Sequence, residues 1–393
     1  MWTAVALGLG GLFSGILGSA LIYRFGHRLT LVDVPNERSS HCSPTPRGAG
    51  AGVWAFFVIA SALVLGNWPL ALTGGAFGLF GLLEDRLSFS SKSRLIVHLA
   101  LASLMVLLWA GPPESAQAAA LFTFWAVFIA STANFYNFMD GINGMAGLTG
   151  AVAFALLSFF SYFIAGRPDI ALMGVALTGG CLGFLPFNIP GAKVFLGDTG
   201  SLFLGFIFAA LTVQLSTSLA VLVCLAMFLC TFYADALRTI FDRIKKRENL
   251  MASHRSHLYQ HLCNESKIPH WKVSLLYASI QLVFGVLSII AYYLGNQALQ
   301  GLVAGVFAVC FLAFYVQARK TGTSQGDFLK NLLQPSKIKK VMLFLLLDVL
   351  ITVVSLYLSF LLRFDLVFPP QYMGLFAVSL PFFVVLRLIV FAW

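Results

Sequence analysis

Long apolar runs recur along the whole chain, and each has about the length that a helix needs to cross a hydrocarbon core of roughly 30 Å. Of the 393 residues, 59% are hydrophobic and 10% are charged. Soluble globular domains usually carry about 25% charged residues, so a soluble globular fold is excluded. The sequence predicts an all-α, polytopic integral membrane protein.

The predicted spans share this length and an apolar interior. They lie near 2–22, 49–66, 68–84, 95–110, 118–136, 144–165, 170–187, 199–214, 217–236, 273–294, 297–317, 341–362 and 371–391. A polar stretch with Gly, Ser, Pro and Lys interrupts them after residue 317. We therefore predict a membrane domain over 1–317 with about 11 spans, a cytoplasmic linker over 318–340, and a tail of about two helices over 341–393.

The net charge of +10 raises the question of nucleic acid binding, but the distribution of charge argues for a membrane. With the N-terminus outside and every span crossing, the loops predicted to lie inside carry 22 of the 25 Lys and Arg residues. This is the positive-inside pattern of membrane proteins. We expect contact with the lipid bilayer, no nucleic acid partner, and functional loops that face the cytoplasm.

Carboxylates recur where predicted spans meet the inside face. Glu84 and Asp85 end the third span, and Asp198 opens the eighth in the sequence VFLGDTGS. A carboxylate at the centre of a span costs about 2.5–3.5 kcal/mol on insertion scales, so their recurrence predicts one shared aqueous site. Two simpler interpretations stay open. Glu84 and Asp85 would be a solvated pair beside Arg86, and Asp198 with Ser201 would be an ordinary helix cap.

The fifth span ends in NFYNFMDGINGMAG, which places oxygen-bearing side chains at helical spacing. Asn137, Asp140 and Asn143 follow one another at intervals of three, so they share one face if the helix continues. The glycines of this stretch would allow the helix to break there. Carboxylate and amide oxygens suit Mg²⁺, with Mn²⁺ as the alternative. We predict that Asp198 and Asn137 hold the metal.

Two loops on the inside face supply cationic donors. The first, VDVPNERSSHCSPTPRGAGAG, contains prolines that exclude a helix and offers Arg38, His41 and Arg47. The late loop contains His254, Arg255 and His257, a compact set of donors for a pyrophosphate. Zinc is the competing idea for this second set, but neither Cys nor Glu stands at zinc-ligand spacing.

In their order along the chain, these motifs resemble those of the polyprenyl-phosphate N-acetylhexosamine-1-phosphate transferases. The motifs are DxPxxRxxH with PTPRG, the acidic pair, NxxxDGxNG, GDTGS and the late His-x-x-His. The resemblance covers about residues 1–317 and is closer to the O-antigen-initiating branch than to the peptidoglycan branch. It implies an Mg²⁺-dependent enzyme of the bacterial inner membrane. That enzyme would move a sugar-1-phosphate from a UDP-N-acetyl sugar to undecaprenyl phosphate, release UMP and start a polysaccharide such as the O-antigen of lipopolysaccharide.

The resemblance also implies roles for individual residues. It places Asp85, Glu84 and Asp198 in catalysis, with Asp85 as the candidate base near the lipid phosphate, because Glu84 replaces the first member of the usual Asp pair. It assigns Asp198 and Asn137 to the metal. The residues assigned to substrate binding are Arg38, His41, Arg47, Asp140, Asn143, His254, Arg255 and His257.

Several alternatives stay open. A polytopic transporter or a lipid-linked sugar flippase would also carry charges in its spans. Within the transferase interpretation, direct attack by the lipid phosphate is favoured over a covalent intermediate on Asp85. The tail over 341–393 resembles the membrane segment that precedes nucleotide-sugar dehydratase or epimerase domains, but no GxGxxG follows it, so no such activity is predicted. The sugar, the role of the tail and homodimer formation are left open.

Overall fold

A computed structural model describes residues 2–35, 43–87, 89–250, 252 and 255–320, together with 355, 359 and 363. Within this part of the chain, nine helices are long and apolar enough to cross a membrane. Every span predicted within 1–317 contains a helix, and the only described sheet has two strands. The all-α, multi-pass architecture is therefore confirmed. The two predicted tail spans lie outside the described residues, apart from isolated positions.

The first half of the chain forms helices joined by short turns and one hairpin. Its elements are α1 (Trp2–Phe25), β1 (Val32–Asp33), β2 (Thr45–Pro46), α2 (Gly50–Ile59), the π-helical turn η1 (Ala60–Val64), α3 (Trp68–Arg86), α4 (Ser91–Ala110), α5 (Ala116–Phe138) and α6 (Met145–Phe163). The rest comprises α7 (Pro168–Phe184), η2 (Leu185–Phe187), α8 (Gly197–Leu215), α9 (Leu219–Ala226), η3 (Met227–Leu229), α10 (Cys230–Lys245), α11 (Leu258–Asn264), α12 (His270–Tyr293) and α13 (Gln297–Lys320).

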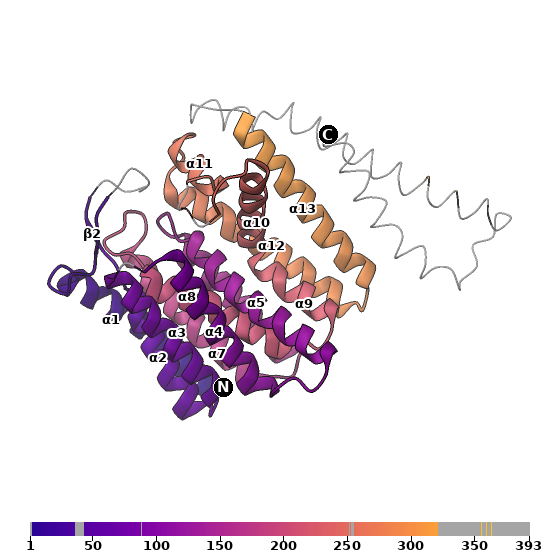
Figure 1. Ribbon diagram of the computed structural model, residues 1–393, viewed down its shortest axis with the longest axis horizontal. Coiled ribbons are helices and arrows are strands. Elements are labelled where there is room, and N and C mark those ends of the chain that lie inside the picture. Colours follow the sequence, from indigo (N-terminus) through magenta and orange to yellow (C-terminus); the bar gives the residue numbers. More distant parts are fainter. Residues whose placement is uncertain are drawn as a thin grey trace.

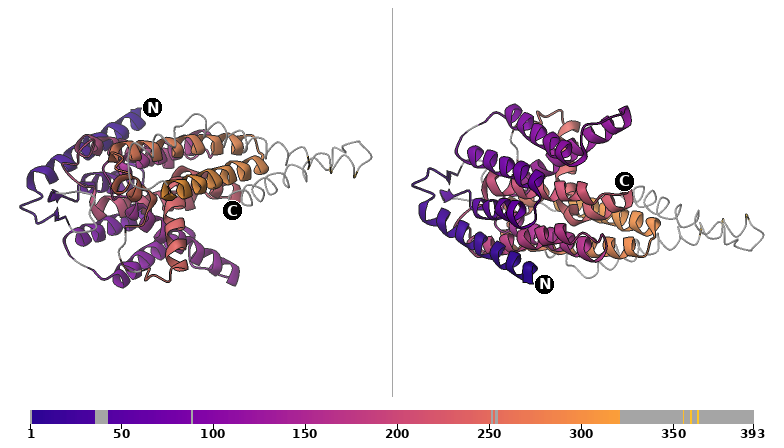
Figure 2. Two further views of the ribbon diagram at one scale, coloured as in Figure 1. Left: turned by 90° about the horizontal axis from the view of Figure 1, so that it is seen from above. Right: turned by 90° about the horizontal axis from the view of Figure 1, so that it is seen from below.

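Helix α8 is the centre of the bundle. Every residue from Thr199 to Leu215 is buried, and the helix packs against α2, α3, α5 and α6. A membrane helix that is apolar on all sides can be enclosed in this way by other helices. Helix α13 packs at the side of the bundle, where it lies along α12 (Figure 2). The residue that opens the GDTGS motif, Gly197, is thus the first residue of the most enclosed helix.

Small residues bring α1 and α7 into close contact. A Cβ atom added at Gly11 would lie 2.0 Å from the carbonyl oxygen of Ala176, and one added at Gly15 would lie 2.3 Å from that of Gly180. In a membrane, where lipid is as apolar as the side chains, such close packing of backbones is a main source of helix association.

The functional loops gather at one end of the bundle. The β1–β2 hairpin and α11 lie at the end away from the N-terminus (Figure 1). The turns after α1, α3, α5, α7 and α10 belong to this end, which we call the basic face because its loops carry most of the Lys and Arg residues. Backbone hydrogen bonds fix the first loop there, since the N–H groups of Gly48 and Ala49 both donate to the Phe195 carbonyl.

Several element boundaries differ from the prediction by a few residues, and the largest difference is at the end of the ninth span. The ninth span, expected over 217–236, is bent at η3 and continues as α10 to Lys245. Its last turns are amphipathic, with Leu237, Phe241 and Ile244 exposed among charged residues, so hydrophobicity alone ended the predicted span too early. Helix α13 also continues past the predicted boundary at residue 317, to Lys320.

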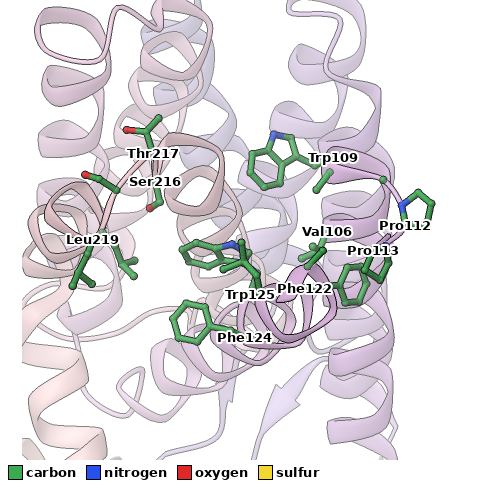
Figure 3. Close-up of a pocket in the computed structure, with 16 residues that line it drawn as sticks. Val106, Trp109, Pro112, Pro113, Phe122, Phe124, Trp125, Ser216, Thr217 and Leu219 are labelled. Atoms are coloured by element: carbon green, nitrogen blue, oxygen red, sulfur yellow. The ribbon is translucent and has the colours of Figure 1, made fainter. Parts of the chain in front are cut away.

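The opposite face holds an apolar pocket of about 660 Å³ between α4, α5 and the turn before α9 (Figure 3). Its lining includes Trp109, Phe122, Trp125 and Leu219. These residues stand at the ends of α4, α5 and α9 that are remote from the basic face. The pocket contains none of the predicted site residues and is separate from their chemistry.

We predict that Gly15→Ala lowers the free energy of unfolding by about 1–3 kcal/mol, because the added methyl group meets backbone rather than a movable side chain. Thermal denaturation in detergent measures the effect. Gly301→Ala is the matched control, since nothing lies within 4 Å of a Cβ atom at Gly301 in α13. This control should be neutral or stabilising by up to about 1 kcal/mol. Equal destabilisation by both substitutions would contradict the close contact of α1 with α7.

Candidate active site

Asp85 caps the first turn of α8 from the end of α3. Its Oδ1 accepts a hydrogen bond from the Asp198 backbone N–H at 2.9 Å. Its Oδ2 accepts from the Thr199 N–H at 3.0 Å and from the Thr199 hydroxyl at 2.7 Å. The first N–H groups of a helix lack partners within it and carry partial positive charge, so a carboxylate is stabilised there. Leu196 occupies the N-cap position without a side-chain cap, so α3 rather than α8 supplies the capping carboxylate.

Glycines make this contact possible. Gly197 has φ of +78°, a conformation that costs other residues steric strain. A Cβ atom there would also lie 2.6 Å from the Asp85 carboxylate and 2.6 Å from the backbone nitrogen of Gly48. At Gly81, one turn before Asp85, a Cβ atom would lie 2.6 Å from the Asp198 carbonyl oxygen. The first glycine of the GDTGS motif is therefore required because α3 and the first loop both approach its backbone closely.

Arg47 joins the first loop to the same place. Its Nε donates to the Asp85 carbonyl oxygen at 3.0 Å and lies 3.7 Å from the Asp85 carboxylate. As the prolines predicted, residues 43–49 of this loop form no helix, and α2 begins at Gly50. Arg38 and His41, predicted to bind substrate from this loop, lie outside the described residues.

Asp198 and Asn137 meet, as the sequence predicted. The Asn137 amide nitrogen donates to Asp198 Oδ1 at 2.6 Å and to the Ser201 hydroxyl at 2.9 Å. The Asp198 side chain is 25% exposed, whereas that of Asp85 is fully buried. Of these two carboxylates, Asp198 is therefore the one that faces solvent.

Glu84 points away from its neighbour Asp85 and toward α4. Arg94 Nε lies 2.7 Å from Glu84 Oε1, and another nitrogen of the same guanidinium lies 3.7 Å from Asp198 Oδ2. The buried His98 follows one turn later, with Nε2 3.9 Å from Glu84 Oε2. We did not predict either residue. Their spacing of four residues in the span after the acidic pair indicates a shared helix face, but it does not show that this face meets Glu84.

The helix break that the DGxNG glycines allowed is present. Helix α5 ends at Phe138, so Asn137 lies in its last turn while Asp140 and Asn143 lie in the following loop. Burial raises the pKa of Asp140 well above its ordinary value, and the nearby Asp198 and Asp85 carboxylates raise it further. Asn143 is held by neighbours, since its side chain donates to the Pro190 carbonyl at 3.3 Å and its own carbonyl accepts from Ser274 at 2.8 Å.

The late loop is anchored by a buried carboxylate. Asp235 of α10 accepts hydrogen bonds from the backbone N–H groups of Leu258 at 2.9 Å and Tyr259 at 3.2 Å. Its Oδ1 lies 3.3 Å from His257 Nδ1, and the His257 side chain is 4% exposed. The predicted substrate ligand His257 is thus enclosed, with one ring nitrogen turned to Asp235. Arg255 is exposed in the same loop, and His254 lies outside the described residues.

The late loop also contacts the end of α5. The Tyr259 hydroxyl donates to the Phe138 carbonyl at 2.8 Å, and a Cβ atom at Gly141 would lie 2.2 Å from that hydroxyl. The NxxxDGxNG motif and the late loop are therefore adjacent. The structure brings all the predicted site residues that it describes to the basic face.

Carboxylates predominate in the inner part of this site. They belong to Glu84, Asp85, Asp140 and Asp198. Among the described residues, no group of three or more His, Cys, Asp or Glu side chains could hold a metal ion. Mg²⁺ usually keeps several waters and shares substrate phosphate oxygens, so it needs few protein ligands. The partly exposed Asp198 carboxylate beside the Asn137 amide fits such an ion.

Comparison with known proteins agrees with this site. Residues 67–216 match the family model of glycosyl transferase family 4. That interval contains Glu84, Asp85, Asn137 and Asp198, which the structure joins through α3, α5 and α8. The fold and the site thus define a membrane-embedded transferase of sugar phosphates.

Individual relatives narrow the class of transferase to which the chain is similar. The chain is 25% identical over 278 residues to the probable undecaprenyl-phosphate N-acetylglucosaminyl 1-phosphate transferase of Bacillus subtilis, which covers 64% of this chain and 75% of that relative. It is 27% identical over 337 residues to the decaprenyl-phosphate N-acetylglucosaminephosphotransferase of Mycolicibacterium smegmatis, which covers 74% and 82%. A phospho-N-acetylmuramoyl-pentapeptide-transferase of Desulfitobacterium hafniense is 35% identical over 133 residues, 34% of this chain and 38% of that relative. The chain is thus similar to polyprenyl-phosphate N-acetylhexosamine-1-phosphate transferases, and the predicted resemblance to that family is confirmed.

We predict that Asp85→Asn destabilises the protein by about 1–3 kcal/mol, because an amide NH₂ would replace an acceptor that faces the N–H groups of α8. The melting temperature in detergent measures this loss. Asp169→Asn is the control, since Asp169 is 41% exposed and pairs with Arg167, and exposed pairs contribute at most about 1 kcal/mol. Equal effects of the two substitutions would show that the Asp85 contacts do not hold α3 to α8.

Proposed function

We propose that the protein transfers N-acetylglucosamine-1-phosphate, or a 6-deoxy relative of it, from a UDP-sugar to undecaprenyl phosphate and releases UMP. The proposal places it in the bacterial inner membrane with the basic face toward the cytoplasm. The product would start a surface polysaccharide such as O-antigen. The observation that carries the proposal is the pairing of Asp198 with Asn137 at the solvent-facing start of the central helix, beside Arg94 and Glu84.

Mg²⁺, or Mn²⁺ in its place, would be held by Asp198 and Asn137. In the present arrangement the Asn137 nitrogen faces Asp198, and a half-turn of the amide would present its oxygen instead. When bound, the ion would neutralise pyrophosphate charge and orient its oxygens.

The proposed roles of the other residues follow from their contacts. Arg94 bridges Glu84 and Asp198 and so sets the position of the metal-binding carboxylate. Asp85 holds α8 in place through its three hydrogen bonds, and its predicted role as a base beside the lipid phosphate stays a prediction. The loop with Asp140 and Asn143 would receive the nucleotide. Direct attack by the lipid phosphate needs positioning more than proton removal, because the nucleophile is already an anion.

An apolar groove offers a place for the isoprenoid chain of the acceptor. Its volume is about 670 Å³, and it lies between α5, the η3 bend with α10, and α13. Phe128, Phe135, Phe307 and Phe311 line it, with Arg238 at its basic-face end. A chain of isoprene units in this groove would place its phosphate near the basic face, where Asn137 follows Phe135 by two residues.

The direct test is release of UMP by the purified full chain supplied with UDP-N-acetylglucosamine, undecaprenyl phosphate and Mg²⁺. A transporter or a flippase of lipid-linked sugars would release none. Omission of undecaprenyl phosphate should abolish the release if the lipid attacks directly. Lipid-independent incorporation of labelled UMP into the UDP-sugar would instead support the covalent path.

We predict that Asp198→Asn lowers turnover to less than about a tenth, a barrier change above roughly 1.4 kcal/mol, because the amide replaces a charged metal ligand. Excess Mg²⁺ should not restore full activity. Asp169→Asn on the opposite face is the control and should retain full turnover. If Asp198→Asn keeps more than about a tenth of the activity, the assignment of Asp198 as a metal ligand is wrong.

We predict that Ala308→Trp, which fills the groove, raises the KM for undecaprenyl phosphate by about tenfold while leaving the KM for the UDP-sugar unchanged. Steady-state kinetics in detergent measure both constants. Ala118→Trp makes the same change in the pocket of the opposite face and should alter neither. If both variants raised the KM for undecaprenyl phosphate equally, the result would contradict the proposal that this groove binds the acceptor.

A further inference from the structure

The basic-face end of α13 holds the late loop by two contacts with backbone carbonyls. The Arg319 guanidinium donates to the carbonyl of Ser256. One turn into α11, His261 Nε2 lies 3.1 Å from the carbonyl oxygen of Ala318. Because a carbonyl oxygen only accepts, His261 carries its proton on Nε2 in this arrangement.

Tyr315 holds Arg319 in position for this contact. The Tyr315 side chain lies over the turn before Arg319 and is 2% exposed, and the Arg319 guanidinium carbon stands 4.9 Å from its ring centroid. The guanidinium carbon of Arg238 stands 5.1 Å from the same ring. Such cation–π contacts restrict a long side chain that would otherwise sample many rotamers.

Helix α10 fixes the tyrosine in turn. The Tyr315 hydroxyl donates to Asp242 Oδ2 at 2.7 Å, and Arg238 pairs with Asp242 Oδ1 at 2.9 Å. We call Arg238, Asp242, Tyr315 and Arg319 the α13 clamp. It connects α10 through α13 to the backbone of Ser256.

The contacted carbonyl has a particular place in the loop. Ser256 stands between Arg255 and His257, the two described residues of the set that the sequence predicts to bind pyrophosphate. A hydrogen bond to its carbonyl fixes the peptide plane that leads into His257. Asp235 holds the other side of the same segment through Leu258 and Tyr259. The loop is thus fixed from α10 on its buried side and from Arg319 on its exposed side.

We infer that Arg319 and Tyr315 are positioning residues for the nucleotide-sugar, which act by fixing the 255–257 segment through the Ser256 carbonyl. The inference rests on the proposed function and on the sequence-based assignment of Arg255 and His257 to pyrophosphate binding. Arg319 acts through the loop rather than on the reacting atoms, so its loss should affect binding of the donor before it affects the chemical step.

The test compares Arg319→Ala with the unaltered full chain. The KM for UDP-N-acetylglucosamine should rise by about tenfold while the KM for undecaprenyl phosphate changes by less than about twofold, because the acceptor does not use this loop. Arg319→Lys should lose less than Arg319→Ala, since lysine keeps a charged donor but lacks the planar guanidinium with its several N–H groups. Tyr315→Phe keeps the ring and loses the bond to Asp242, so it should give a smaller rise.

Arg24→Ala is the control, because Arg24 is also an exposed arginine of the basic face but belongs to α1. It should leave both constants unchanged. Equal rises of the two KM values in Arg319→Ala, or a fall in kcat alone, would overturn the inference and indicate general destabilisation. If Arg319→Ala does not fold, Arg319→Lys and Tyr315→Phe carry the same comparison.

A second measurement separates this inference from the proposed function. Amide hydrogen exchange of the peptide covering 255–264 should become faster in Arg319→Ala and stay unchanged in Arg24→Ala. Unchanged exchange in Arg319→Ala would overturn the positioning role even if the enzyme is active. Failure of the unaltered chain to release UMP would refute the proposed function, and the exchange result would still report whether the clamp holds the loop.

Discussion

The contact of Asp85 with the first turn of α8 is the interaction on which the arrangement of the site depends. A carboxylate enclosed among helices needs donors, and the first N–H groups of an enclosed helix need acceptors. The Asp85 carboxylate and the start of α8 satisfy each other, since Asp85 accepts three hydrogen bonds from Asp198 and Thr199. Because α8 is the central helix, this contact sets the depth of α8 relative to α3 and leaves the Asp198 side chain facing solvent.

The acidic pair divides its work between two helices. Consecutive residues of an α-helix point about 100° apart, so Glu84 and Asp85 cannot face the same neighbour. Asp85 faces α8, and Glu84 faces Arg94 of α4. Two adjacent carboxylates that would repel each other in one pocket thus join α3 to α8 and to α4. Arg94 completes the connection by approaching Asp198 as well.

The sequence predicted those features that follow from hydrophobicity and from short-range spacing. The spans within 1–317 and the meeting of Asn137 with Asp198 belong to this group, whereas the sequence allowed the break after Phe138 without deciding it. Arg94 and His98 were missed because basic residues near span ends are expected in any membrane protein, and only the fold brings these two beside Glu84.

Hydrogen bonds between residues far apart in the sequence could not be predicted either. Nothing in the local sequence indicates that Asp235 accepts hydrogen bonds from the backbone N–H groups of Leu258 and Tyr259. The same contacts enclose His257, which an unfolded loop would leave open. The amphipathic turns of α10 were missed for a different reason, because a search for continuous apolar length stops where charged residues begin.

The backbone pairing of the first loop with the segment before α8 has a consequence for how this region can change. Gly48, Ala49 and Gly50 donate to the carbonyls of Phe195 and Leu196, and these bonds use main-chain atoms only. The side chain of Phe195 is therefore replaceable without loss of the pairing. The number of residues between Arg47 and Gly50 is fixed more strictly. Deletion of one of them would shift the Arg47 guanidinium by one position along the pairing. Arg47 would then leave the Asp85 carbonyl, so we expect the protein to tolerate substitution of Phe195 but neither insertion nor deletion between Arg47 and Gly50.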